Sequence, residues 1–400
     1  MPIKVTEKCV GCFACTNICP TKCINMALND EGFIVPEVDF TKCVNCDKCT
    51  ETCLQQKLPS MNVPIKSYRL LHKNKEIWNK STSGGAFSAI CSSFNDDTYF
   101  CGASFDENLE VKHIIVKGYG NDFNKLLKSK YVQSNIGSVF TEIKKLLLSD
   151  NTVIFSGTPC QVAALKLYLG CIKYDNLYCI DVACHGVGSP KILKQHLMTI
   201  ENKNKTKINK IGFREKRFTL SGLEDYGFLI ESDNKKVIDY SDIYTKAFHN
   251  GIVIRSSCLD CQFHKKERVG DITIADLKGM YETFPKEIKD KFNRSAVFAN
   301  TKKGVEIVER LKQEKDIECI ECTFGQASKN NSPLYEKHNQ KISDRRNQFF
   351  DMYKTLRDDD VDTLLNNYIN KESIILKIWL KIPEKQRVIV KKILRKGDSK

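Results

Sequence analysis

Residues 153–170, VIFSGTPCQVAALKLYLG, contain the pattern that decides the fold of the main part of this chain. A short strand-forming run passes into a Gly, a Thr-Pro pair and Cys160, and apolar residues with helical spacing follow at once. A strand that turns directly into a helix is typical of α/β folds, so the segment predicts strand, turn and helix in that order. At such a turn Cys160 would suit a phosphate loop, an activated nucleophile or a metal ligand.

The same alternation continues from about residue 65 to residue 325. Apolar runs that end in turn residues predict strands within residues 152–159, 177–186 and 270–279. Helical spacing predicts helices within residues 161–169, 189–200 and 304–314. In the second of these, Ser189 would be the N-cap and Pro190 would lie in the first turn. The fold class that follows is α+β, with a mixed α/β main domain.

Composition limits the class of protein further. The 400 residues are 41% hydrophobic and 28% charged, a balance typical of folded globular proteins. The sequence has neither a signal peptide nor a run of about 18 apolar residues, so we expect a cytoplasmic protein without a membrane span. Lys and Arg exceed Asp and Glu by 63 − 49 = 14, which favours anionic partners, but their scatter along the chain does not favour nucleic acid.

Nineteen cysteines in such a chain indicate metal or redox chemistry rather than disulfides. Four form the pattern C-x2-C-x2-C-x3-C at residues 9–19, and the pattern returns at residues 43–53. This spacing is that of bacterial two-cluster ferredoxins, in which the fourth cysteine of a motif ligates the other cluster. The predicted ligands are Cys9, Cys12, Cys15 and Cys53 for the first 4Fe–4S cluster and Cys19, Cys43, Cys46 and Cys49 for the second.

Residues 1–57 are therefore predicted to be a two-cluster 4Fe–4S ferredoxin-type domain, and residues 58–64, which contain two prolines, a linker. A zinc domain is the alternative, although zinc sites use pairs of C-x2-C rather than triplets. Cys23 is expected to be unligated. Such a domain would pass single electrons between an outside carrier and the rest of the chain.

Five further motifs follow in order: STSGGAFSAI at 81–90, KSKYVQSN at 128–135, FSGTPCQVAAL at 155–165, DVACHGVGSP at 181–190 and CLDCQFHKKERVGDITIADLKG at 258–279. Together they resemble the beta-subunit family of coenzyme F420 hydrogenases and dehydrogenases, several members of which have a ferredoxin domain in front. The resemblance implies that residues 65–330 bind FAD beside a 4Fe–4S cluster. It also implies hydride transfer between that flavin and an organic acceptor.

The same resemblance implies a third 4Fe–4S cluster on Cys160, Cys184, Cys258 and Cys261. Four thiolates suit such a cluster, and Cys160 would then be a ligand. An inert core thiol and a reactive thiol are the alternatives for Cys160, and a reactive thiol would need a His partner such as His185.

The flavin site is implied by the motifs as well. Small residues ahead of a helix let backbone N–H groups approach a phosphate, so residues 83–85 are expected to contact the FAD pyrophosphate, although Ser-Gly-Gly is common in ordinary turns. His185 and Lys278 are candidates for catalysis, and Ala275 and Lys278 depart from the family pattern near the acceptor pocket. The predicted cofactor-binding residues are Ser83, Gly84, Gly85, Lys130, Tyr131, Gln133, Ser134, Thr158 and Asp276.

Other cysteines need a separate explanation. Cys319 and Cys322 form a second C-x2-C pair that rivals Cys258 and Cys261. Their flanks alternate as in a strand, which would put the two thiols on opposite faces and suits a cluster poorly. The remaining single cysteines are predicted to be small core residues: Cys91, Cys101, Cys171 and Cys179.

Residues 331–400 are predicted to form a helical, basic tail. Within it, residues 372–397 are amphipathic, with Trp379 between lysines. Such a segment would lie on an anionic membrane surface or pack on the main domain or on a second subunit. Pro383 divides the segment, which favours packing.

The function that these patterns predict is an iron–sulfur flavoprotein oxidoreductase with three 4Fe–4S clusters and FAD. The predicted partners are ferredoxin or a similar electron carrier, an organic acceptor, and a second copy of the chain. Coenzyme F420 and another small molecule, such as a sugar-type metabolite, are the two acceptors considered. The alternatives are a non-catalytic electron-transfer subunit of a larger hydrogenase or dehydrogenase, and a zinc-rich nucleic-acid module.

Overall fold

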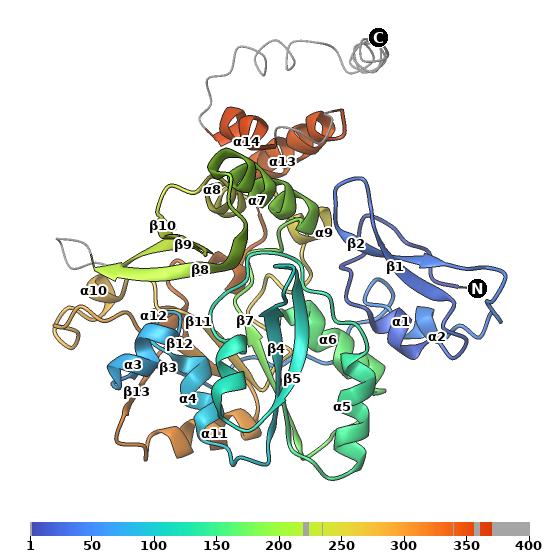
Figure 1. The fold of residues 1–400 in the computed structure, drawn as a ribbon. Coiled ribbons are helices and arrows are strands. Elements are labelled where there is room, and N and C mark those ends of the chain that lie inside the picture. The colour runs from blue at the N-terminus through green and yellow to red at the C-terminus, as the bar shows by residue number, and fades with distance from the viewer. Residues whose placement is uncertain (1, 219–223, 234, 339, 356–360, 370–400) are drawn as a thin grey trace.

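The computed structural model describes residues 2–218, 224–233, 235–338, 340–355 and 361–369 of the chain. The described strands form three sheets, of two, three and eight strands. Figure 1 shows the two-stranded sheet to one side of the eight-stranded sheet. The three-stranded sheet lies above the eight-stranded sheet, among helices. The mixed α/β architecture predicted from the sequence is confirmed.

The eight-stranded sheet is the centre of the main part. Its strand order is β13-β3-β12-β11-β7-β6-β4-β5, in which the middle strands β11, β7, β6 and β4 are parallel and the outer neighbours antiparallel. The three strands predicted from apolar runs are β6, β7 and β11. The strands are β3 (Lys66–His72), β4 (Tyr99–Phe105), β5 (Val111–Lys117), β6 (Val153–Gly157), β7 (Leu177–Val182), β11 (Ile272–Asp276), β12 (Ser295–Ala299) and β13 (Ile317–Cys322).

Helices cover both faces of this sheet. Val153 and Phe155 of β6 pack into the core with α5 and α6, whereas Ile154 packs into the opposite core with α4 and α11. Because both faces are covered, the middle strands read as continuous apolar runs. The helices are α4 (Ala86–Ser92), α5 (Val139–Leu148), α6 (Pro159–Tyr168) and α11 (Lys302–Leu311), of which α6 and α11 were predicted.

Short helices make the remaining connections around the sheet. Most are a single turn long, so they serve to turn the chain rather than to cover a face. They are α3 (Lys75–Lys80), η1 (Asn121–Leu126), α9 (Ser256–Leu259), α10 (Met280–Thr283), α12 (Phe324–Ser328) and η2 (Ser332–Leu334).

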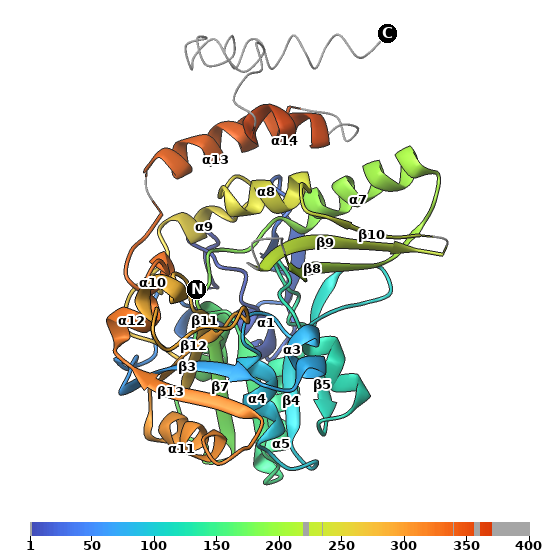
Figure 2. The same cartoon turned by 90° about the vertical axis from the view of Figure 1, so that its left-hand side faces the viewer.

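A second layer lies above the sheet. Figure 2 shows α13 and α14 lying over α7 and α8, and these helices share one apolar core with β8 and β9. Ser189 is the N-cap of α7, as predicted, and its hydroxyl accepts from the Ile192 N–H at 3.4 Å. The layer consists of α7 (Pro190–Asn204), β8 (Ile208–Phe218), β9 (Glu224–Ser232), β10 (Lys235–Asp239), α8 (Ile243–His249), α13 (Gln340–Tyr353) and α14 (Val361–Ile369).

In the N-terminal part, the two cysteine motifs have the same backbone conformation at equivalent positions. Gly11 and Asn45, which occupy equivalent positions of the two motifs, both have left-handed backbone angles, with φ of 60° and 51°. Phe13 and Asp47 form a second such pair, and each is the N-cap of a short helix. The elements are α1 (Ala14–Ile18), β1 (Ile24–Leu28), β2 (Ile34–Val38) and α2 (Lys48–Glu51).

This part packs firmly on the main part. Phe13 belongs to the core formed by α5 and α6, and the Asn17 amide donates to the Gly137 carbonyl at 2.8 Å. The predicted linker is also tied down, because Asn62 and Arg268 exchange two backbone hydrogen bonds of 2.8 Å. The two parts therefore form one continuous body around the linker.

Nothing in the described ranges is a helix of the length and hydropathy that a bilayer span requires. The basic amphipathic segment predicted at residues 372–397 lies outside the described residues.

A buried histidine joins three helices of the upper layer. The imidazole of His196 on α7 contacts Asp242 through Nε2 at 2.8 Å and Asp362 through Nδ1 at 2.7 Å. Both ring nitrogens face carboxylates, so both must donate, which only the charged imidazolium can do. Although burial alone would lower the pKa of His196, the two carboxylates raise it to about 9.

Stability is expected to depend on pH through His196. Its pKa in the folded chain lies above the ordinary value of about 6.5, so its contribution is full below pH 6.5 and is lost as pH rises through about 9. Between pH 6.5 and about 9, the free energy of unfolding measured in urea should fall in the wild type. In His196→Asn this fall should be smaller, by on the order of 3 kcal/mol. Equal pH dependence in the two proteins would contradict this role, and Asp362→Asn should give an intermediate dependence.

Candidate functional site

Two small cavities in the N-terminal part are bordered by its cysteines. The first is lined by Cys9, Cys12, Cys15 and Cys53. The second is lined by Cys19, Cys43, Cys46 and Cys49, with Cys23 beside them. The structure therefore places Cys53 with the first motif and Cys19 with the second. Cys23 is close as well, since its sulfur lies 3.4 Å from that of Cys19.

Several thiols of the first set have raised pKa values. Burial, together with the neighbouring Cys9 and Cys53, raises the pKa of the Cys15 thiol to about 12. Burial likewise raises the pKa of Cys12 well above its ordinary value. A thiolate is the form that binds metal, so a positive centre is needed to hold these groups ionised.

The spacing of the cysteines bears on the kind of metal. Within the described ranges, no three His, Cys, Asp or Glu side chains converge closely enough to hold a single ion. Four cysteines border each of the two cavities, and four thiolates are the ligand set of a 4Fe–4S cluster.

A third cavity lies in the main part, at the carboxyl ends of β6 and β7. Four cysteines line it: Cys160, Cys184, Cys258 and Cys261. Cys160 sits in the first turn of α6, where Thr158 and Gln161 form a capping box, and the Thr158 hydroxyl lies 3.1 Å from the Cys160 sulfur. Burial raises the pKa of Cys160 to about 11 and that of Cys258 to about 12.

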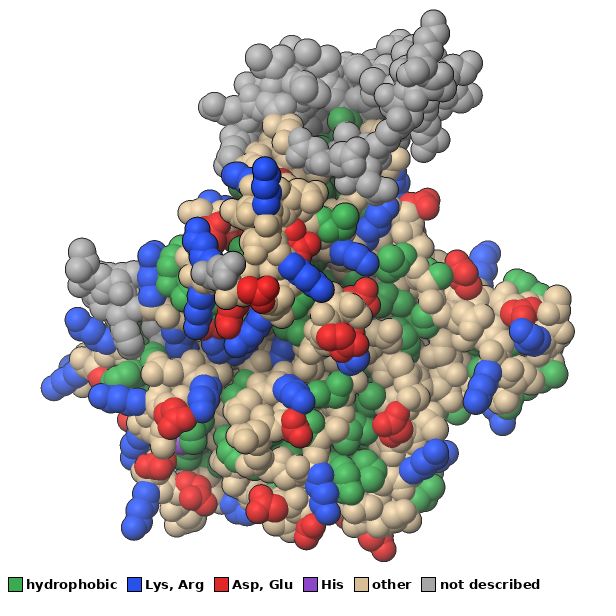
Figure 3. Space-filling view, in the orientation of Figure 1, with side chains coloured by type: hydrophobic (Ala, Val, Ile, Leu, Met, Phe, Trp, Pro, Cys, Tyr) green, Lys and Arg blue, Asp and Glu red, His purple; other side chains and the backbone are tan. Residues whose placement is uncertain are grey.

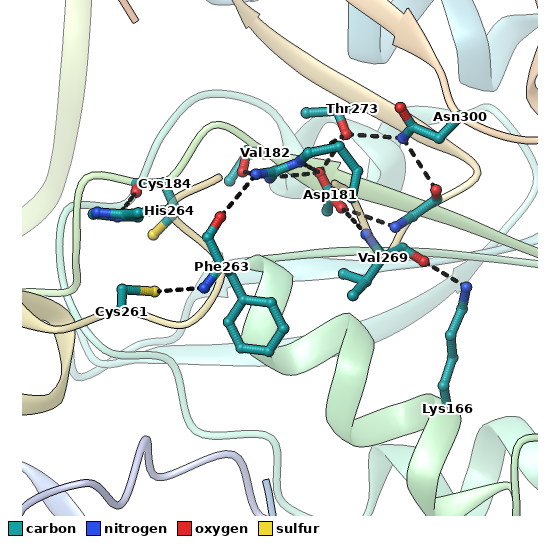
Figure 4. A network of polar contacts seen from close by, with 12 residues as sticks. Lys166, Asp181, Val182, Cys184, Cys261, Phe263, His264, Val269, Thr273 and Asn300 are labelled. Carbon is teal, nitrogen blue, oxygen red and sulfur yellow. Dashed lines mark hydrogen bonds and ion pairs between the residues drawn. The ribbon is translucent and has the colours of Figure 1, made fainter. Parts of the chain in front are cut away.

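A buried ion pair between Asp181 and Arg268 connects two of these cysteine loops, and Figure 4 shows the polar network around Asp181. The Arg268 guanidinium, at 2% exposure, donates to Asp181 at 2.9 Å and to the carbonyl of Phe263 at 3.1 Å. The Phe263 N–H in turn lies 3.4 Å from the Cys261 sulfur. Arg268 also donates to the Val182 carbonyl at 3.2 Å, two residues before Cys184.

Asp181 completes this network from the end of β7. Its carboxylate is fully buried and accepts the backbone N–H groups of Val269 and Gly270, at 3.2 and 2.8 Å. It also accepts the Thr273 hydroxyl at 2.6 Å. A buried charge is stable only when it is paired and hydrogen-bonded. The loop that carries Arg268, Val269 and Gly270 therefore has one favourable position.

A fourth cavity is much larger than these three and has a volume of about 520 Å³. It lies beyond the carboxyl ends of β6, β7 and β11 and reaches the three-stranded sheet at Arg214 and Tyr226. Crevices at this edge of parallel strands are where α/β proteins commonly bind ligands. Nine of the residues predicted to bind the cofactor or to act in catalysis line it: Ser83, Gly85, Lys130, Tyr131, Ser134, Thr158, His185, Asp276 and Lys278.

Two predicted flavin contacts lie elsewhere. Gly84 does not line the large cavity but is wedged against β3, where an added Cβ would lie 2.2 Å from the Leu70 carbonyl oxygen. Gln133 is directed to the N-terminal part: its amide donates to the Ile34 carbonyl at 3.0 Å and accepts the Ile34 N–H at 2.8 Å. Gln133 therefore joins the two parts of the chain.

Arg214 was not foreseen from the sequence, because it lies in β8, outside all five motifs. Its guanidinium binds Asp276 through two hydrogen bonds of 2.9 Å and stacks 4.1 Å from the Tyr226 ring centroid. Its φ of 64° falls at an irregularity in the pairing of β8 with β9. The Arg214 cation holds the pKa of Asp276 below its usual range although burial acts to raise it.

The lysines of the cavity differ in their partners. The Lys130 ammonium donates to the carbonyls of Lys125, Leu127 and Lys128, and burial lowers its pKa to about 7. Lys130 thus secures its own loop. Lys278 makes no ion pair with any described residue, and burial lowers its pKa.

The remaining cysteines fall outside these sites. Cys319 packs in the core below one face of the sheet and Cys322 in the core on the other, so the pair cannot serve one cluster. Cys91, Cys101 and Cys179 are buried, as predicted. Cys171 is exposed, contrary to prediction, because it occupies a left-handed turn after α6 with φ of 57°.

The four cavities adjoin one another in series. The large cavity and the third share walls at Ser134, Thr158 and Cys184. The third and the first share Val10 and Gly11. The first and second meet in one apolar cluster that contains cysteines of both sets. A continuous route therefore leads from the second cavity to the large one.

Comparison with known proteins agrees with this arrangement. Residues 150–323 match the family model that describes the C terminus of the coenzyme F420 hydrogenase/dehydrogenase beta subunit. This part of the chain therefore has the C-terminal domain of the beta-subunit family. Residues 8–56 match the model of the 4Fe–4S dicluster domain, so the chain also carries such a domain at its N-terminus. The resemblance predicted from the motifs is confirmed.

Curated relatives match the N-terminal domain of the chain. Ferredoxin YfhL of Escherichia coli is 30% identical over 81 residues, which cover 20% of this chain and 88% of that protein. An uncharacterized protein from the rpl9-rpl11 intergenic region of Porphyra purpurea is 35% identical over 54 residues, 12% of this chain and 68% of that protein. Among solved structures, the F420-reducing NiFe hydrogenase complex from Methanosarcina barkeri contains a chain 18% identical, with a TM-score of 0.40, covering 65% of this chain and 82% of that one.

Removing Arg268 is expected to destabilise the chain strongly. Arg268→Met leaves the Asp181 charge buried without its partner, which typically costs about 3–5 kcal/mol. Urea unfolding should show a loss of that size. The matched control is Lys80→Ala, which removes an exposed ion pair to Glu76 and should cost less than about 1 kcal/mol. Similar losses in the two variants would contradict the role of the buried pair.

Proposed function

We propose that this chain is an iron–sulfur flavoprotein oxidoreductase that passes electrons between a one-electron carrier, such as ferredoxin, and an organic acceptor. One observation carries the proposal: the cavities adjoin in series, three lined by cysteines and the last of a size for an organic cofactor. When bound, 4Fe–4S clusters supply one-electron transfer and a flavin converts it to hydride transfer.

The cysteines are the proposed cluster ligands. All of them except Cys46 are buried or partly buried, each set of four borders one cavity, and burial raises the pKa of several, among them Cys15 and Cys258, which fits a polynuclear centre. At the third cavity, Ser257 Oγ and His264 Nδ1 are buried without a partner in the described structure, which supports a bound group there. The proposed sets are Cys9, Cys12, Cys15 and Cys53; Cys19, Cys43, Cys46 and Cys49; and Cys160, Cys184, Cys258 and Cys261.

The large cavity is the proposed FAD site. A volume of about 520 Å³ suits a cofactor of this size, and ligand sites are commonly 300–1,000 Å³. Thr158 and Ser134 line both this cavity and the third one, so a flavin here and a cluster there would lie close together. The proposed binding residues are those predicted residues that line the cavity: Ser83, Gly85, Lys130, Tyr131, Ser134, Thr158 and Asp276.

Solvent access to this cavity favours an enzyme over a subunit without a substrate. His249, which lines the cavity, is exposed, and Lys278 is partly exposed beside it. An acceptor, whether coenzyme F420 or another small molecule, would reach the flavin from this side. On the face seen in Figure 3, basic side chains are interspersed with acidic ones, unlike the basic stripe of a nucleic-acid interface.

The proposed domains follow from the same arrangement. Residues 1–57 would hold two clusters, and residues 65–330 would hold the third cluster and FAD. Within residues 331–400, the described α-helices are α13 and α14. They share the core of the upper layer and so stabilise the layer that lies above the large cavity.

Metal and flavin analysis of anaerobically purified full-length protein tests the proposal. We expect about twelve iron, about twelve sulfide and about one FAD per chain. Cys160→Ala and Cys258→Ala should each lower iron to about eight, because the third set loses a ligand. Cys319→Ala and Cys322→Ala are the matched controls and should keep about twelve. About eight iron without flavin in the wild type would limit the chain to the two N-terminal clusters.

A further inference from the structure

Arg255 is a buried cation without an anionic partner. It is 3% exposed, its Nε donates to the Cys9 carbonyl at 2.8 Å, and its Nη1 donates to the Ile34 carbonyl at 3.1 Å. In the part of the chain that the structure describes, no carboxylate pairs with it. Carbonyl oxygens orient the guanidinium but do not neutralise its charge, so the charge remains uncompensated in these contacts.

Other buried arginines of the chain show what is missing at Arg255. Three of them, Arg268, Arg294 and Arg346, pair with carboxylates. A fourth, Arg69, lies 4.5 Å from the Phe284 ring centroid, and Arg255 likewise lies 5.5 Å from that of Phe33, so the opposite charge is what Arg255 lacks. A buried charge is costly unless an opposite charge lies near it.

The surroundings of Arg255 indicate where the opposite charge comes from. Its Nη1 lies beside Gly11, where an added Cβ would be 2.8 Å away, and Gly11 lines both the first and the third cavity. The Arg255 carbonyl also accepts the Cys258 N–H at 3.0 Å, which ties the residue directly to a cysteine of the third set. Arg255 therefore lies where two negatively charged sets of thiolates would meet.

We propose that Arg255 is the counter-cation of the third cluster and the residue that fixes it against the first. This inference rests on the proposed function. One-electron reduction adds one negative charge to a cluster, and a fixed cation nearby stabilises that charge, so Arg255 raises the reduction potential of the third cluster. Through the Cys9 and Ile34 carbonyls, the same side chain holds the N-terminal domain at the third cavity.

Substitutions that separate charge from hydrogen bonding test this role. Arg255→Gln keeps a donor but removes the charge, and Arg255→Lys keeps the charge. The control is Arg346→Gln, another buried arginine that joins the main part to Glu31 of the N-terminal domain but whose hydrogen bonds go to Glu31, Asn347 and the Ile254 carbonyl and to no cysteine. The readouts are iron per chain and an EPR-monitored redox titration, with the third-cluster signal identified by its loss in Cys160→Ala.

We expect a more negative midpoint potential for the third cluster in Arg255→Gln, and a potential near that of the wild type in Arg255→Lys and Arg346→Gln. Loss of the third cluster in Arg255→Gln but not in Arg255→Lys would support the same role. An unchanged potential in loaded Arg255→Gln overturns the proposal, and so does loss of the cluster in both Arg255 variants, which would point to geometry alone. A wild type with about eight iron would instead overturn the proposed function itself.

Discussion

The buried ion pair between Asp181 and Arg268 is the constraint on which the rest of the site depends. It joins the end of β7 to the loop that follows Cys261, and the backbone of Arg268 also fixes the linker at Asn62. Because both charges are removed from water, neither can be left without the other. The pair therefore brings the loops of Cys184 and Cys261 to one edge of the sheet, and it brings the N-terminal domain close to the same edge.

The carboxyl ends of parallel strands supply the place where these groups gather. β6 ends at the turn that carries Cys160, β7 ends three residues before His185, and β11 ends at Asp276. Strands that run in parallel release their following loops on the same side, so residues distant in sequence meet there. The three-stranded sheet closes this space from above and contributes Arg214, which pairs with Asp276 across the large cavity.

Much of this arrangement was predictable from local patterns. The cysteine repeat indicated how Cys19 and Cys53 are exchanged between cavities, and the run at residues 153–170 indicated β6 and α6. Prediction was wrong at Cys171, where exposure follows from a left-handed turn. Spacing also did not reveal that the Gln133 side chain bonds to Ile34 of the N-terminal part. At both residues the contact involves backbone geometry or a distant segment that spacing does not encode.

The sequence by itself determined the chemistry of this protein: which residue types are present, their spacing, and the strands and helices that carry them. These follow from local rules, because cluster motifs and amphipathic periods extend over a few residues. Only the tertiary structure decided that the cavities adjoin in series, that Arg255 lies between two of them without a carboxylate, and that Arg214 reaches the largest. The reason is physical: burial and charge compensation depend on segments far apart in the sequence, such as Glu31 and Arg346 at a separation of 315 residues, which meet only when the chain packs.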